Sequence, residues 1–384
     1  MPPSHAAGPS EPPLLEETIG ATLRRVAAAQ GDREALVARH QGIRLSYAEL
    51  DAASDRLACA LLALGVEQGD RIGIWAPNCA EWVLTQFATA RIGAVLVNIN
   101  PAYRTTELRY ALAQSGCRAL IAARAFKSSD YVAMVDEVRP ELPALADVFW
   151  LGGAEWDALL ARAGEVEAGT LATREAALSP SDPINIQYTS GTTGAPKGAT
   201  LSHRNILNNG YLVGAACGYG PEDRVCIPVP FYHCFGMVMG NLGAVAHGAC
   251  MVIPSAAFEP EATLAAVAEK RCTSLYGVPT MFIAELGHPS FAGPRRHRCR
   301  RRRAPTIRSR SASARSAASI RTSRCRSSTR AAPSWGAASR ASCARAGTAS
   351  CPAIGTTPSA RPRRSTATAG CTPATSRRWT RTAT

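Results

Sequence analysis

The C-terminal part of the chain lacks the side chains from which protein cores are built. Residues 294–384 contain no Leu, Val, Phe, Tyr or Met, and their large apolar side chains are Ile307, Ile320, Trp335, Ile354 and Trp379. Such a segment cannot bury enough apolar surface to offset the entropy lost when a chain becomes ordered. We therefore expect residues 294–384 to be disordered.

The same segment lacks Lys, Asp and Glu but holds 22 arginines. It supplies the whole positive excess behind the net charge of +14, because the first 293 residues contain 21 basic and 29 acidic side chains. An arginine-rich arm for nucleic acid is one interpretation of the stretch GPRRHRCRRRRAP, residues 293–305. Natural basic arms mix Lys with Arg, so we disfavour this interpretation and expect no specific nucleic-acid partner.

Residues 1–293 lack several signals of other protein classes. Their eight cysteines form no Cys-x-x-Cys pair, which fits buried thiols in a reducing compartment better than disulfides or metal ligands. The N-terminus has neither a basic start nor an apolar run, and no apolar stretch is long enough to span a membrane. We expect a cytoplasmic protein, and the sequence does not indicate its oligomeric state.

Helices alternate with short apolar strands between a flexible Pro/Ser-rich leader, residues 1–13, and residue 293. This alternation predicts an α/β fold with mixed, mostly parallel sheets flanked by helices. Ser46 and Glu49 form a predicted capping box for a helix that ends before Gly65. Further strands are predicted at residues 71–75, 94–98 and 119–121, and further helices at 81–92 and 105–114. We predict a first α/β subdomain at residues 14–180 and a second at 181–293.

From Pro183 the pattern changes to a strand, a glycine-rich loop and a helix that starts at Ser202. The loop, Thr189–Gly198, combines glycines and uncharged hydroxyls with Lys197, one of only three lysines in the chain. Glycine amides, hydroxyl donors and one cation form a cradle for phosphate groups. The loop is not a Walker A motif, because Pro196 and Gly198 replace required residues. The alternative, a flexible surface turn, does not account for this density of glycines and donors.

Three motifs carry a resemblance to a known family. The run Thr189-Ser190-Gly191-Thr192-Thr193-Gly194-Ala195-Pro196-Lys197-Gly198 resembles the signature of the AMP-forming adenylate ligases, which include acyl-CoA synthetases. PVPFYHCFG, residues 228–236, resembles the family's proline–aromatic–His segment, and YGVPTMF, residues 276–282, resembles its VPT segment. The resemblance extends from about Leu14 to about Gly293. At residues 185–188 and 203–206 it is closest to the fatty acyl-CoA synthetase branch.

The resemblance implies a ligase that activates a medium- or long-chain fatty acid with ATP and Mg²⁺ and transfers the acyl group to coenzyme A. Lys197 and His233 would be catalytic, and Thr189 would contact the metal. The cofactor site would comprise Thr189, Ser190, Gly191, Thr192, Thr193, Gly194, Lys197, Tyr276, Gly277, Val278 and Pro279. The residue pattern alone leaves His233 open as a hydrogen-bonded core side chain. We interpret His203 as a residue that helps to start its helix.

Other motifs of the resembled family are missing. The sequence contains no Tyr-Gly-x-Thr-Glu motif, no Thr-Gly-Asp motif and no C-terminal domain with an adenylation lysine. We therefore predict that the chain as translated is an inactive fragment. The alternative is a fragment that binds nucleotide without catalysis.

The missing region reappears in a shifted reading frame. GC-rich codons for residues 368–384 can be written so that a shift of one base gives DGWMHTGDLATMDADGYV, which contains the Thr-Gly-Asp motif. In the same frame, residues 316–330 give VGRVHPHLEVQIVDP and residues 351–357 give MPGYWND, and both resemble family segments. We hypothesise that bases were lost near Gly293 by deletion, sequencing error or gene-model error.

Sequencing of the genomic DNA across the codon for Gly293 tests the frameshift hypothesis. We expect a downstream reading frame that encodes the C-terminal half of the family, because the shifted translation reproduces family segments in their usual order. A locus without such a frame contradicts the hypothesis.

Overall fold

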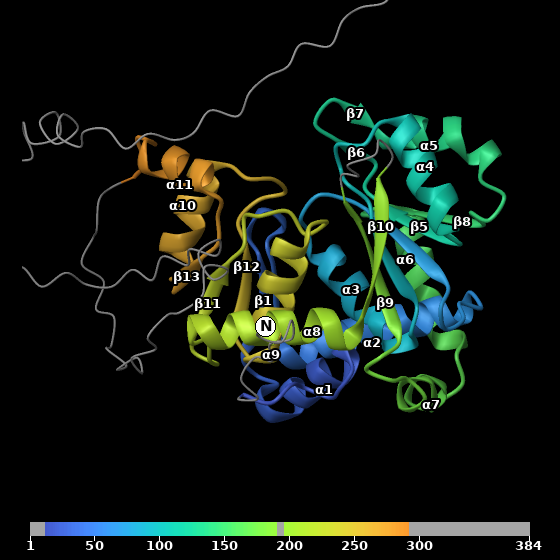
Figure 1. Cartoon of the computed structure of the whole chain (residues 1–384), viewed down its shortest axis with the longest axis horizontal. Helices are drawn as coiled ribbons and strands as arrows, with labels where there is room; N and C mark the ends of the chain where they lie inside the picture. The colour runs from blue at the N-terminus through green and yellow to red at the C-terminus, as the bar shows by residue number, and fades with distance from the viewer. Residues whose placement is uncertain (1–11, 190–195, 292–384) are drawn as a thin grey trace, which may run out of the picture. The chain divides into compact units, whose positions relative to one another are not determined.

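Two β-sheets with helices packed against them make up the described part of the chain (Figure 1). The structure, a computed structural model, describes residues 12–189 and 196–291. The predicted α/β class is confirmed. The predictions for most of the leader, for loop residues 190–195 and for the arginine-rich tail lie outside the described residues.

The larger sheet holds six strands in the order β10-β9-β4-β3-β5-β8. Neighbours from β9 to β8 are parallel, whereas β10 runs antiparallel to β9 at the edge. The central strands β3, β4 and β5 are short, mostly buried runs, as is typical of parallel strands covered on both faces. The bounds are β3 (Arg71–Trp75), β4 (Val95–Asn98), β5 (Ala119–Ala122), β8 (Asp147–Trp150), β9 (Pro183–Thr189) and β10 (Lys197–Ser202).

The smaller sheet holds five strands in the order β13-β11-β12-β1-β2. Its strands are β1 (Glu34–Ala38), β2 (Ile43–Ser46), β11 (Arg224–Cys226), β12 (Cys250–Ile253) and β13 (Ser274–Leu275). β1 pairs in parallel with β12, although more than 200 residues separate them. The sheets therefore do not divide at residue 180, since each takes strands from both predicted subdomains.

The helices of the described residues lie mainly between consecutive strands. They are α1 (Ile19–Gln30), α2 (Tyr47–Ala63), α3 (Ala80–Ile92), α4 (Thr105–Ser115), α5 (Tyr131–Val138), α6 (Ala154–Ala161), α7 (Thr170–Ala176), α8 (His203–Cys217), α9 (Gly243–Ala246), α10 (Pro260–Glu269), α11 (Pro279–Leu286) and a π-helix (Phe235–Leu242). The predicted capping box of α2 is confirmed: the Glu49 amide donates to Ser46 Oγ, and the Ser46 amide donates to the Glu49 carboxylate. A small pair, β6 (Ala125–Phe126) and β7 (Ser129–Asp130), stands apart from both sheets.

Different helices cover the two faces of the six-stranded sheet. α4 and α5 cover one face, where Trp75 stacks on Tyr131 with ring centroids 3.5 Å apart. α2, α3 and α6 cover the other face. α3 is buried on almost every side, because its Trp82 and Phe87 also share a core with Leu36 of the five-stranded sheet. This helix therefore fixes how the two sheets lie against each other.

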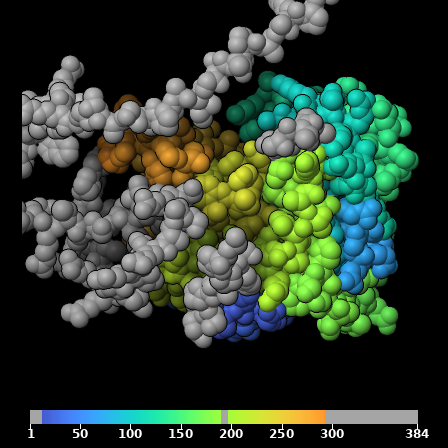
Figure 2. All heavy atoms as spheres, in the orientation of Figure 1, coloured from blue at the N-terminus to red at the C-terminus, as the bar shows by residue number. Residues whose placement is uncertain are grey.

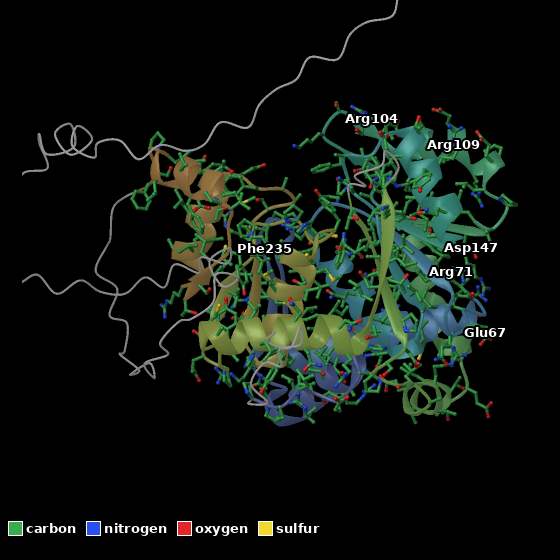
Figure 3. All side chains as sticks on the ribbon, in the orientation of Figure 1. Glu67, Arg71, Arg104, Arg109, Asp147 and Phe235 are labelled. Atoms are coloured by element: carbon green, nitrogen blue, oxygen red, sulfur yellow. The ribbon has the colours of Figure 1, made fainter. Side chains whose placement is uncertain are left out.

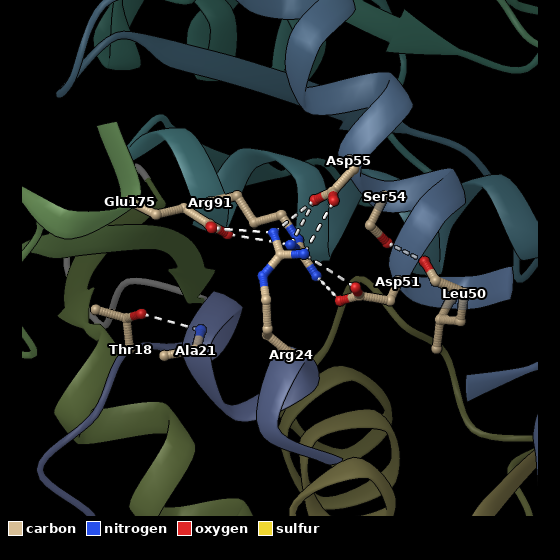
Figure 4. Close-up of polar contacts among 9 residues, drawn as sticks. All are labelled: Thr18, Ala21, Arg24, Leu50, Asp51, Ser54, Asp55, Arg91 and Glu175. Atoms are coloured by element: carbon tan, nitrogen blue, oxygen red, sulfur yellow. Dashed lines mark hydrogen bonds and ion pairs between the residues drawn. The ribbon is translucent and has the colours of Figure 1, made fainter. Parts of the chain in front are cut away.

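Arg91, near the C-terminus of α3, is a charged residue in this mostly apolar environment, with a side chain that is 0% exposed. Its guanidinium binds Asp51 and Asp55 of α2 and, at 3.1 Å, Glu175 of α7. Arg24 of α1 binds the same three carboxylates at 2.9–3.1 Å (Figure 4). Two guanidiniums and three carboxylates thus join four helices.

Replacement of Arg91 by Met should lower the free energy of unfolding by about 3 kcal/mol, because it leaves three partly buried carboxylates around a single guanidinium. Arg24→Met is the matched control. It removes a guanidinium that is 42% exposed and should cost about 1 kcal/mol or less. Urea titration, monitored by tryptophan fluorescence, measures the free energy of unfolding of both variants. Equal losses of stability in the two variants would contradict the central role of Arg91.

Candidate functional site

The predicted phosphate loop joins two antiparallel strands. The predicted end of the loop at Gly198 is wrong, since β10 occupies Lys197–Ser202 and pairs with β9, whereas the predicted helix start at Ser202 is confirmed. Most of β10 is exposed, and its surface is visible in Figure 2, so it lacks the apolar pattern that marks a strand in the sequence. α8 begins only after β10, with Ser202 as its N-cap. The loop therefore does not sit at a helix N-terminus, and helix-dipole stabilisation of phosphate does not apply to it.

Thr189 and Lys197 are pairing partners at the loop end of this hairpin, and both side chains are exposed. Thr189 Oγ1 donates a long hydrogen bond of 3.4 Å to the Lys197 carbonyl oxygen. The Tyr110 hydroxyl of α4 donates to the Pro196 carbonyl at 3.0 Å and fixes the end of the loop. The other predicted loop residues, Ser190, Gly191, Thr192, Thr193 and Gly194, lie outside the described residues, so their roles stay predictions.

His233 lies in an exposed turn before the π-helix, so it is not a buried core side chain. Its Nδ1 accepts a hydrogen bond from the Phe235 amide at 3.1 Å, so a neutral imidazole carries its proton on Nε2. The turn is tightly closed: a Cβ atom at Gly236 would lie 2.3 Å from the Pro230 carbonyl oxygen. Burial raises the pKa of the neighbouring Cys234 thiol and so disfavours its nucleophilic thiolate form.

The predicted turn Tyr276–Pro279 connects β13 to α11. The buried Tyr276 donates its hydroxyl to the Met239 carbonyl at 3.1 Å, and its ring meets the edge of Phe235 (labelled in Figure 3) at 5.4 Å between centroids. Gly277 lies close to the Phe282 ring, where a Cβ atom would approach to 3.0 Å. Val278 and Pro279 are exposed at the start of α11. This turn thus presents its Val278–Pro279 end to solvent beside the π-helix.

The segment of residues 229–239 contains His233 and contacts both the β9–β10 hairpin and the Tyr276–Pro279 turn. The Tyr232 carbonyl accepts a hydrogen bond from Gln187 of β9 at 2.9 Å, while Phe235 and Met239 contact Tyr276. Asn78 holds the same segment from the loop after β3, through the Val229 carbonyl and the Phe231 amide. Residues 185–188 resemble a family segment, but this resemblance does not predict the hydrogen bonds that the side-chain amides of Asn185 and Gln187 form. The signal that could have predicted these hydrogen bonds is the presence of Asn98, Asn185 and Gln187 inside otherwise mostly apolar strands.

A magnesium site is incomplete in the described residues. No group of three His, Cys, Asp or Glu side chains among residues 12–189 and 196–291 lies close enough to hold a metal ion. Thr189 offers one exposed, neutral hydroxyl oxygen, whereas protein-bound Mg²⁺ usually takes one or two carboxylates together with substrate phosphates. Thr189 therefore fits only as a single additional ligand to a cation that arrives with phosphate groups.

Within the same described ranges, no helix is both long and apolar enough to cross a membrane.

Comparisons with known proteins agree with this fold and these motifs. Residues 23–356 match a family model described as AMP-binding enzyme. The chain is 40% identical over 310 residues to the mitochondrial medium-chain acyl-CoA ligase ACSF2 of Danio rerio, covering 75% of this chain and 51% of that one. The inhibitor-bound N-terminal domain of FACL13 from Mycobacterium tuberculosis aligns with a TM-score of 0.62 and 26% identity, over 72% of this chain and 67% of that one. ATP-bound MatB from Rhodopseudomonas palustris aligns with a TM-score of 0.60 and 27% identity, over 72% and 52%.

The chain belongs to the AMP-binding enzyme family, the adenylate-forming ligases, and its curated relatives are acyl-CoA ligases. It spans about half the length of those relatives. The family match runs to residue 356 and so extends past Gly293, where the recognisable motifs end.

His203 contributes to packing between α8 and α1. Its side chain is 0% exposed, and Nδ1 accepts a hydrogen bond from the Ile19 amide at 3.2 Å. His203 is the first residue of α8, but Ser202 and Asn205 form the capping box of this helix, so the prediction that His203 helps to start it stays a prediction. Burial lowers the pKa of His203 to about 4, against an opposing effect of Asp182.

His203→Gln should reduce the loss of stability in acid. The unfolded imidazole has a pKa near 6.5, so between pH 6.5 and about 4 the unfolded chain binds more protons and unfolding is favoured. Below pH 4 the resulting loss in the free energy of unfolding amounts to about 3 kcal/mol. Glu285, whose pKa burial raises to about 7, acts in the opposite direction, so the variant is compared with the parent at each pH by urea titration. A difference that stays constant from pH 7 to pH 4 would contradict the assignment.

Proposed function

We propose that this chain derives from an enzyme that activates a medium- or long-chain fatty acid in two steps. In the first step a carboxylate oxygen of the acid attacks the α-phosphorus of ATP, and pyrophosphate leaves. In the second step the sulfur of coenzyme A attacks the carbonyl carbon of the acyl-adenylate, and AMP leaves. Similarity to a ligase named for medium-chain acyl groups supports this substrate class. The observation that carries the proposal is the exposed Thr189–Lys197 pair, connected through β9 to the His233 segment.

The described residues would act mainly by positioning and by neutralising charge, on which adenylyl transfer depends. The Lys197 ammonium would bind phosphate oxygens at the end of the hairpin. Mg²⁺, held in part by the Thr189 hydroxyl, would supply further positive charge. His233 would border the acyl group, where Nε2–H can donate to a developing negative oxygen. The turn Tyr276–Pro279 would border the adenine. The location of the protein in the cytoplasm stays a prediction.

We further propose that the 384-residue polypeptide alone does not complete this reaction. Its sequence contains neither the Tyr-Gly-x-Thr-Glu nor the Thr-Gly-Asp motif, so the glutamate for the metal and the aspartate for the ribose have no counterpart. A second candidate function, nucleotide binding without catalysis, is favoured by the exposed Lys197 and Thr189 side chains at the loop.

Decanoate-dependent exchange of labelled pyrophosphate into ATP tests the proposed inactivity of the purified chain. We expect no exchange above background, and exchange would overturn the proposed inactivity.

Calorimetric titration with MgATP tests the second candidate function, nucleotide binding without catalysis. Lys197→Ala should weaken binding about tenfold, because it removes a charge-assisted contact to phosphate. Lys270→Ala, which removes a lysine at the end of α10, is the matched control. Equal effects of the two substitutions would contradict the assignment of Lys197.

A further inference from the structure

Three buried side-chain amides form a chain of hydrogen bonds next to the His233 segment. Asn185 Nδ2 donates to Asn98 Oδ1 at 3.0 Å, and Asn98 Nδ2 donates to Gln187 Oε1 at 3.1 Å. Gln187 Nε2 and Asn98 Nδ2 both donate to the Tyr232 carbonyl oxygen, at 2.9 and 3.3 Å. All three amide side chains are buried. The contacts of Asn98 and Gln187 with this carbonyl are called the amide bridge below.

Within the sheet the amides add hydrogen bonds between β4 and β9, and Asn185 Nδ2 also donates to the Leu96 carbonyl oxygen at 3.0 Å. Asn98 and Gln187 are paired positions of the neighbouring parallel strands β4 and β9, where side chains are normally apolar. A buried amide costs free energy unless each polar group is hydrogen bonded, and Asn185 Oδ1 has no partner within the described part of the chain. Apolar side chains of similar size would serve the sheet at lower cost. Asn98 and Gln187 differ from Asn185 in that they also donate to the segment outside the sheet, which accepts both hydrogen bonds at the Tyr232 carbonyl oxygen.

The amide bridge connects two parts of the candidate site that belong to different sheets. Gln187 lies two residues before Thr189, the pairing partner of Lys197 in the six-stranded sheet. Tyr232 directly precedes His233 in a segment that follows β11 of the five-stranded sheet. We propose that Asn98 and Gln187 are positioning residues that hold the His233 segment at a fixed distance from the Thr189–Lys197 pair. An acyl-adenylate that contacts both would then bind in one geometry, an inference that rests on the proposed function.

Removal of the bridge should shift the segment without unfolding it. Asn78 still holds the segment through the Val229 carbonyl at 2.9 Å and the Phe231 amide at 2.8 Å. Gln187→Met and Asn98→Leu keep similar side-chain volumes but remove the donors to the Tyr232 carbonyl. The matched control is Asn208→Leu, since Asn208 is also a buried amide but binds the backbone of Leu15, in the segment before α1.

Hydrogen–deuterium exchange of the full chain tests the bridge without any ligand. In Gln187→Met and Asn98→Leu, the amides of residues 233–237 should exchange about tenfold faster, the effect expected for one lost hydrogen bond to a buried acceptor. The control variant should leave these amides unchanged. Unchanged exchange in the bridge variants overturns the proposal whatever the chain binds.

Binding of two probes separates positioning from a merely structural role. The probes are a decanoyl-adenylate analogue with a sulfamoyl linkage, which would contact both parts, and magnesium pyrophosphate, which would contact only the Lys197 end. Each bridge variant should lose about tenfold in affinity for the analogue and less than about twofold for pyrophosphate. The double variant should lose little more, because the two amides act as one unit.

Equal losses for both probes, or no loss for either, would overturn the positioning role and leave the amides structural. If the parent chain binds neither probe, the proposed function fails. In that case the exchange measurement still decides whether the amide bridge fixes the His233 segment.

Discussion

The burial of helix α3 between the two sheets is the constraint on which the rest of the structure depends. Its Trp82 meets the ring of Phe231 at 5.6 Å, and its Gln86 donates to the Met237 carbonyl at 3.1 Å and accepts from Asn241. The helix thus determines where the π-helix and the preceding His233 turn can lie. Through Arg91 the same helix is tied by ion pairs to α2 and α7, whose carboxylates also bind Arg24 of α1. A displacement of α3 would therefore move the two halves of the candidate site relative to each other.

Close approach of backbones limits the remaining freedom of the His233 turn. A Cβ atom at Gly210 of α8 would lie 2.7 Å from the Val238 carbonyl oxygen, and one at Gly240 would lie 2.9 Å from Ile227. Small residues therefore let α8 and the Ile227 side chain, directly after β11, pack against the π-helix. π-Helical turns are uncommon and often occur at functional sites, where they reposition a side chain. Here the π-helix starts directly after the His233–Cys234 turn and carries Met239, the acceptor for Tyr276.

Local features of the sequence predicted the local structure well. The capping box at Ser46 and the strand 71–75 follow from short-range hydrogen bonding and apolar patterning, and the structure confirms both. β10 escaped prediction because most of its residues are small or polar and four of the six are exposed, and only pairing with β9 makes them a strand. The placement of β1 beside β12 escaped for a related reason: it depends on contacts between distant segments, to which no local pattern refers. The amide bridge joins residues 98, 187 and 232 and is non-local in the same sense.

The described end of the β9–β10 hairpin carries little charge. The hairpin end presents one ammonium, Lys197, and one neutral hydroxyl, Thr189, and no cluster of metal-binding side chains appears in the described ranges. A single exposed cation attracts a polyphosphate only weakly in water, because solvent screens the interaction and competes for the donors. Strong binding of a transferring phosphoryl group needs several charges around it. The ammonium and the hydroxyl at the described end of the hairpin therefore supply too little charge to stabilise a transferring phosphoryl group by themselves.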